Sequence, residues 1–299
     1  MTSIADVEPP PRHGLGRRLS TFFVRHSHLR LAALLALPLG WLLVIYLGSL
    51  FLLLLASFWS IGGILGTDIV HSWNLDNYKT LFQEPVYRNV AFRTISMAAL
   101  VTIADAVLAF PIAYYMARVA SPHTRNLLVV AVLTPLWASY LVKAYSWRTI
   151  LGEEGVLNWL LAPFGLSGPG YSQTGLWLAF TYLWLPFMIL PIYAGLERIP
   201  GSLLEASADL GGKSLRTFWK VTLPLAFPAV VAGSIFTFSL TLGDYILPGL
   251  ISNEQFIGTV IYNDRGSNLP VAAAFAMVPI AVMTVYLWGA KRLGAFENL

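Results

Sequence analysis

The sequence predicts an all-α integral membrane protein with six transmembrane helices and a short additional helix in a polar loop. Two observations predict this fold class. Apolar residues make up 57% of the 299 residues and charged residues only 11%, whereas soluble domains carry roughly 25% charged residues to keep their surface in water. The apolar residues are also gathered into long uninterrupted stretches, which are typical of helices that face lipid.

Six stretches are long enough to cross a bilayer. Spanning about 30 Å of hydrocarbon takes about 20 residues of helix. The stretches are residues 31–57, 94–117, 126–142, 175–196, 221–247 and 266–290. Residues 31–292 are therefore expected to form one transmembrane domain, preceded by a polar, basic tail at residues 1–30.

The distribution of lysine and arginine predicts that both termini lie in the cytoplasm. With the first tail inside, the inner connections carry thirteen of these residues: Arg12, Arg17, Arg18, Arg25, Arg30, Arg118, Arg125, Arg198, Lys213, Arg216, Lys220, Lys291 and Arg292. The outer connections carry six: Lys79, Arg88, Arg93, Lys143, Arg148 and Arg265. Cytoplasmic loops of membrane proteins are enriched in positive charge, so this orientation is favoured over its reverse.

The inner loop at residues 197–220 has the signals of a helix outside the membrane. Ser202 is followed three residues later by Glu205, which is the spacing of a capping box at a helix N-terminus. Gly211 or Gly212 supplies the left-handed residue that often ends a helix. The loop therefore predicts a helix of about two turns from Leu203 to Leu210.

This short helix presents Leu203 and Leu204 outside the bilayer. The two leucines suit burial against a partner protein, and they suit equally a helix that rests on lipid headgroups. Ser214 is placed to cap a second helix that leads into the fifth span.

The same loop resembles the EAA loop of the permease subunits of bacterial ABC importers. That loop has the form E-A-A, three residues, G, nine residues, I-x-L-P. The chain matches it with Glu205-Ala206-Ser207, Gly211 and Val221-Thr222-Leu223-Pro224, and departs from it with Ser207 for the second alanine and Val221 for isoleucine.

The resemblance extends over nearly the whole chain beyond its tail. The segments Pro135–Trp147, Ile150-Leu151-Gly152 and Leu242-Gly243-Asp244-Tyr245 are similar to the first permease subunit of spermidine/putrescine importers. The resemblance implies a permease in the bacterial cytoplasmic membrane, paired as a heterodimer with a homologous second permease. It also implies two cytoplasmic ATPase subunits and an external solute-binding protein as partners, with no nucleic acid.

In this family the EAA helix docks into a groove on the ATPase and transmits its closure. The resemblance implies that role for Leu203, Leu204, Glu205, Ala206, Asp209 and Gly211. The chain itself is not expected to be an enzyme or to hold a cofactor, because ATP and magnesium would bind to the partner ATPase. Gly212-Lys213-Ser214 looks like the end of a phosphate-binding loop, but Ser207 stands where that motif needs its first glycine. No histidine spacing predicts a metal site.

Acidic and aromatic residues in the spans suggest a path for a cation. A carboxylate in the bilayer costs about 2.5–3.5 kcal/mol on insertion scales, so it should face the bundle interior or a water-filled path. A polyamine needs anionic partners and aromatic faces to replace its water. The candidate residues are Asp105, Trp137, Tyr140, Tyr182, Trp184, Asp244 and Tyr245. Both acids have an alternative role as structural residues that hold helices together.

Other functions remain open within and beyond this class. The alternative within the class is an importer of the same type for an amino acid, a phosphonate or ferric iron. A secondary transporter that works alone, or a membrane-embedded enzyme, has less support. The chain shows neither the internal repeat of such transporters nor a cluster of catalytic residues.

Overall fold

The computed structural model describes residues 27–62 and 68–294, and the chain divides between Leu55 and Ala56 into two compact units. The first unit is an apolar helix made of α2 (Ser27–Trp41), the π-helical turn η1 (Leu42–Leu47) and α3 (Gly48–Ala56). It is a candidate membrane span from Leu34 to Ala56. The expected polar tail lies outside the described residues, except for the last residues before the span.

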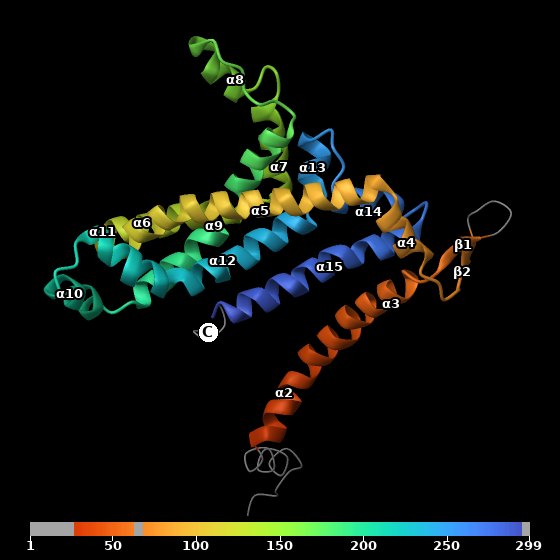
Figure 1. Cartoon of the computed structure of the whole chain (residues 1–299), viewed down its shortest axis with the longest axis horizontal. Helices are drawn as coiled ribbons and strands as arrows, with labels where there is room; N and C mark the ends of the chain where they lie inside the picture. The colour runs from red at the N-terminus through yellow and green to blue at the C-terminus, as the bar shows by residue number, and fades with distance from the viewer. Residues whose placement is uncertain (1–26, 63–67, 295–299) are drawn as a thin grey trace, which may run out of the picture. The chain divides into compact units, whose positions relative to one another are not determined.

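The second unit is a helical bundle. Its long helices are α5 (Pro85–Tyr114), α6 (Pro122–Trp137), α9 (Gln173–Arg198), α12 (Leu223–Gly243) and α15 (Leu269–Arg292). Helices α5, α9 and α12 pack on one another, and α15 packs on α12 (Figure 1). Their contact faces carry small and branched apolar residues, and the outward faces of α5 and α15 remain apolar, which suits a bundle in lipid.

Short elements lie at the two ends of this bundle (Figure 1). One end carries α10 (Gly201–Asp209), α11 (Ser214–Thr217) and the π-helical turn η4 (Phe218–Thr222), and is called the α10 end. At the other end, called the α14 end, α4 (Asp76–Gln83) and α14 (Ile257–Asp264) pack on α15. The remaining elements are the π-helical turn η2 (Tyr115–Val119), α7 (Tyr140–Leu151), α8 (Val156–Leu161), the 3-10 turn η3 (Ala162–Phe164) and α13 (Ile246–Ile251).

A small antiparallel hairpin precedes α4 and departs from the all-helical expectation. Strands β1 (Ser60–Gly62) and β2 (Asp68–Val70) pair with Ser60 opposite Val70. Asn77 holds the base of the hairpin, since its Nδ2 donates to the carbonyls of Ser57 at 2.8 Å and Trp59 at 2.7 Å.

Five helices are long and apolar enough to span a membrane, and a bent helix pair makes a possible sixth, in the part of the chain that the structure describes. This number agrees with the six predicted spans, but the predicted bounds of the second, third and fifth spans were wrong. The second span begins nine residues earlier than expected, at Pro85. Its first turns carry Arg88 and Arg93, which lower the hydropathy without preventing a helix.

The third and fifth spans were predicted as continuous helices, and each is interrupted. Helix α6 ends at Trp137, and α7 leaves it at an angle of 92°. The fifth helix ends at Gly243, and a separate short helix, α13, follows Asp244. With 16 residues, α6 is about 24 Å long, so it falls short of the roughly 30 Å of hydrocarbon.

Placing the α10 end in the cytoplasm predicts which single cysteines an impermeant thiol reagent will reach. The native chain has no cysteine, and both Lys213 and Glu84 are exposed, at the α10 end and near the start of α5 respectively. In intact cells, Glu84→Cys is expected to react and Lys213→Cys to stay unlabelled, because a charged reagent does not cross the bilayer. After detergent solubilisation both should react. Labelling of only position 213 in intact cells would show that the orientation is the reverse of the predicted one.

Candidate functional site

The loop that resembles the EAA loop folds as a helix, but it starts differently from the prediction. Helix α10 begins at Gly201, with Pro200 as its N-cap residue, and no side chain caps it. The predicted capping box of Ser202 and Glu205 is therefore wrong, because Ser202 already lies in the first turn. Ser214 likewise does not cap α11, since Lys213 occupies the N-cap position.

The C-terminus of α10 agrees with the prediction. Gly211 has a φ of +77°, a left-handed conformation that glycine adopts without the steric cost of a Cβ atom. The amide of Gly211 donates to the carbonyl of Ala208 and that of Gly212 to the carbonyl of Ser207, each at 2.8 Å. These two bonds form a Schellman motif, which satisfies the last carbonyls of the helix. The hydroxyls of Ser207 and Thr217 lie 2.8 Å apart and join α10 to α11.

The side chains of α10 form an uncovered, largely apolar face. Leu203 is exposed, and Leu210, just past the helix end, is 89% exposed. Leu204 is half-buried, whereas Glu205, Ala206 and Asp209 are exposed. The described part of the chain leaves Leu210, Glu205 and Asp209 exposed, so this surface suits contact with another molecule.

Two arginines hold the base from which α10 projects. Arg118 Nη2 donates to the carbonyls of Leu196 at 2.5 Å and Ile199 at 2.8 Å, on both sides of the end of α9. Arg125 pairs through Nη1 with Glu197 Oε1 at 3.2 Å. In the sequence both arginines were interpreted only as positive charges of an inner connection. Arg118 follows the end of the predicted second span, and basic side chains near a helix C-terminus often bind last carbonyls. Arg125 lies near the N-terminus of α6 and carried no such signal.

Three of the predicted path residues come together at the break between α12 and α13. Tyr140, at the start of α7, donates a hydrogen bond from its hydroxyl to Asp244 Oδ2. Its ring is stacked on Trp184 of α9, with centroids 5.9 Å apart and planes 6° apart. Asp244 Oδ1 accepts from the amides of Ile246 at 2.8 Å and Leu247 at 3.1 Å. Tyr140, Trp184 and Asp244 are called the aromatic–acid group below.

Two other predicted path residues lie in separate aromatic contacts. Tyr182 packs against Trp147 of α7 at 5.5 Å between centroids. Tyr245 stacks on Tyr262 of α14 at 4.7 Å, and both line a cavity of about 460 Å³ at the junction of α7, α13 and α14. The guanidinium of Arg265 lies 3.5 Å from the centroid of the Tyr262 ring, so this tyrosine already has a cation on it.

Asp105 and Trp137 stand apart from the aromatic–acid group. Asp105 is fully buried on α5, and neither carboxylate oxygen has a hydrogen-bond partner among the described residues. Val101 and Ala109, one turn away on either side, belong to the two core clusters between α5 and α9. Asp105 therefore lies in the interior where α5 packs against α9. Trp137, at the end of α6, is 91% exposed.

The comparisons with known proteins identify the family. Residues 109–294 match the model of the binding-protein-dependent transport system inner membrane component. The chain is 45% identical over 311 residues to the inner membrane ABC transporter permease protein YdcU of Escherichia coli, with 98% of each chain covered. It is 30% identical over 232 residues to the spermidine/putrescine transport system permease protein PotB of Haemophilus influenzae, covering 75% of this chain and 80% of the relative.

Solved structures share the fold. A chain of the bacterial alginate ABC transporter, in complex with an alginate pentasaccharide-bound periplasmic protein, superposes with a TM-score of 0.67 at 20% identity. That superposition covers 93% of this chain and 97% of the other. A chain of the MetNI methionine ABC transporter gives a TM-score of 0.56 at 17% identity, covering 71% of this chain and 97% of the other. The chain therefore belongs to the family of binding-protein-dependent transport system inner membrane components, and it is a multi-pass permease subunit of an ABC importer.

Proposed function

We propose that this chain is one of two homologous permease subunits of a bacterial importer for polyamines such as spermidine or putrescine. The importer is powered by two separate ATPase subunits, and an external solute-binding protein supplies it. The α10 end faces the cytoplasm and the α14 end faces outward. The observation that carries the substrate proposal is the aromatic–acid group, which joins one carboxylate to two stacked rings.

The exposed face of α10 supports its role as the ATPase contact. Leu203 and Leu210 are apolar side chains in an aqueous loop, and Glu205 and Asp209 flank them with charge. Burial of exposed apolar surface drives protein association. The Schellman motif and the Ser207–Thr217 contact keep the helix in place before the partner binds. ATP and magnesium bind to the partner.

The chemistry of the aromatic–acid group supports a cationic solute. Polyamines carry ammonium groups with pKa values near that of lysine, about 10.4, so they stay charged at neutral pH. A cation that leaves water needs a carboxylate or an aromatic face in its place. The likeness to PotB, whose name specifies spermidine and putrescine, supports the same substrate class.

A second candidate, import of another small solute, is favoured by one observation. Both oxygens of Asp244 already have partners, because Tyr140 binds one and the first amides of α13 bind the other. Asp244 is then a structural residue that caps α13 whatever the solute. Under this reading the substrate is an amino acid, a phosphonate or ferric iron.

Changing Gly211 tests the ATPase contact. We expect Gly211→Val to weaken co-purification of the ATPase subunits, because a left-handed residue with a side chain costs roughly 1–2 kcal/mol. The matched control is Gly201→Ala in the same helix, where an added Cβ meets no atom within 4 Å. Both variants should leave the thermal stability of the bundle unchanged. ATPase recovery equal to wild type with Gly211→Val would contradict the role of α10.

Changing Asp244 distinguishes the two substrate candidates. Asp244→Asn keeps an oxygen that accepts from the amides of Ile246 and Leu247, but it removes the charge. We expect polyamine uptake by assembled complexes in vesicles to fall by about tenfold, which corresponds to roughly 1.4 kcal/mol, with unchanged assembly and basal ATP hydrolysis. Asp105→Asn is expected to have a weaker effect. Absence of polyamine uptake by the unaltered complex would favour the second candidate. Wild-type polyamine uptake by the double variant would show that neither acid contacts the cation.

A further inference from the structure

Helix α5 connects the two segments that a transport cycle has to move together. We infer that α5 carries movement between α10 and the outer loop at Ser252–Phe256, and that Arg118 and Arg93 are the positioning residues at its two ends. This inference rests on the proposed function, since it assumes that an ATPase moves α10. The helix and its π-helical extension run without a break from Pro85 to Val119. The 30 residues of α5 alone extend about 45 Å.

At the α10 end, Arg118 binds the junction between α9 and α10, where the regular α-helical hydrogen bonding stops. Ile199 is extended, with φ −70° and ψ 119°, and Pro200 has no amide hydrogen to continue the α9 ladder. The Arg118 guanidinium binds the Leu196 carbonyl in the last turn of α9 and the Ile199 carbonyl beyond it. A movement of α10 therefore acts on α5 through this side chain. Hydrogen bonds to a charged group are stronger than those between neutral groups.

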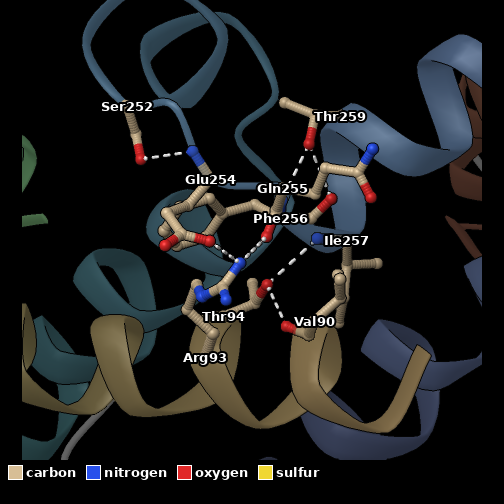
Figure 2. A network of polar contacts seen from close by, with 9 residues as sticks. All are labelled: Val90, Arg93, Thr94, Ser252, Glu254, Gln255, Phe256, Ile257 and Thr259. Atoms are coloured by element: carbon tan, nitrogen blue, oxygen red, sulfur yellow. Dashed lines mark hydrogen bonds and ion pairs between the residues drawn. The ribbon is translucent and has the colours of Figure 1, made fainter. Parts of the chain in front are cut away.

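At the α14 end, consecutive residues of α5 hold the loop between α13 and α14 (Figure 2). Arg93 Nη1 lies 2.7 Å from Glu254 Oε2 and donates to the Gln255 carbonyl at 3.0 Å. Thr94 is buried, and its hydroxyl oxygen accepts from the amide of Ile257 at 3.0 Å. The loop therefore has both a charged and a neutral attachment to the same turn of α5.

The loop itself has little freedom to move independently of these attachments. The Thr259 hydroxyl accepts from the Phe256 amide at 2.8 Å and donates to the Phe256 carbonyl at 2.8 Å, while Ser252 Oγ accepts from the Glu254 amide at 3.1 Å (Figure 2). The Phe256 side chain is buried in the same cluster as Leu247 and Ile251 of α13. Helix α13 and the loop therefore form one packed segment.

This packed segment also touches the aromatic–acid group directly. The carboxylate of Asp244 accepts hydrogen bonds from the first two amides of α13. On the other side, a Cβ built on Gly258 at the start of α14 would lie 2.7 Å from the Asp244 carbonyl oxygen, so α14 packs against the backbone of Asp244. A shift of α5 that moves the loop consequently changes the position of Asp244 relative to Tyr140 on α7.

The experiment measures whether the outer loop responds to nucleotide. Asn253 is exposed in the middle of the loop, and Asn253→Cys provides a single thiol whose labelling rate is measured in the assembled complex, with and without vanadate-trapped nucleotide. With wild-type arginines we expect the two rates to differ by about fivefold or more, which is the range of typical coupling between sites.

Arg118→Gln and Arg93→Gln are expected to abolish this difference while the ATPase subunits remain attached and hydrolyse ATP. Matched controls are Arg216→Gln at the α10 end and Arg88→Gln near the start of α5, both exposed, which should keep the difference. The double variant Arg93→Glu with Glu254→Arg exchanges the two charges. It should restore part of the difference in labelling rate, because the ion pair re-forms. The rescue would show that the ion pair itself, and not either side chain alone, is needed for the response.

The outcomes separate failure of this inference from failure of the proposed function. If both glutamine variants keep the wild-type response, α5 is not the connection and the inference is wrong. If the complex with unaltered arginines shows no response to nucleotide and no ATPase attachment, the proposed function fails as well. If Arg118→Gln does not assemble, Arg93→Gln decides by itself, and a full wild-type response with it would count against the inference.

Discussion

The structure depends on one constraint: backbone amides and carbonyls in the hydrocarbon region have to be paired within the protein. Continuous helices meet this requirement by themselves, and most of the bundle consists of them. The informative places are those where a helix stops, because the freed groups then need other partners. In the described residues, two of these places lie in the candidate functional regions, and side chains bind the freed groups there.

The first place is the end of α9, where Arg118 binds the carbonyls of Leu196 and Ile199, just before the proline that precedes α10. The second is the end of α12, where the carboxylate of Asp244 binds the first amides of α13 and the hydroxyl of Tyr140. One lies at the base of the segment that resembles the ATPase contact of importers. The other lies in the aromatic–acid group. Two of the helix interruptions therefore lie in the two candidate functional regions.

The two acids differ in their surroundings. The Asp105 carboxylate is fully buried and has no hydrogen-bond partner in the described part of the chain, which is a costly arrangement. Asp244 is only half-buried, and its neighbour Tyr245 lines the cavity at the junction of α7, α13 and α14. Of the two acids, Asp244 is therefore the better candidate for contact with a solute.

Local signals in the sequence predicted much of the fold and less of the site. The existence of the spans follows from hydropathy, and the end of α10 follows from Gly211, because both depend on residues close in sequence. The start of α10 was missed because Pro200, not Ser202, precedes its first turn. The break after Trp137 has no hydropathy signal, since the apolar run continues through it. The contact of Tyr140 with Asp244 joins residues 104 positions apart and depends on packing.

The central claim, that α10 is the contact through which an ATPase drives this permease, is tested most directly by site-specific photo-cross-linking in membranes. A photoreactive residue is placed at Leu210, which is 89% exposed at the α10 end, and for comparison at Phe92, which is 75% exposed near the α14 end. The account predicts an adduct between position 210 and the ATPase subunit and none from position 92. No ATPase adduct from position 210, with lipid as its main product, would contradict the claim and favour a helix that rests on the membrane surface.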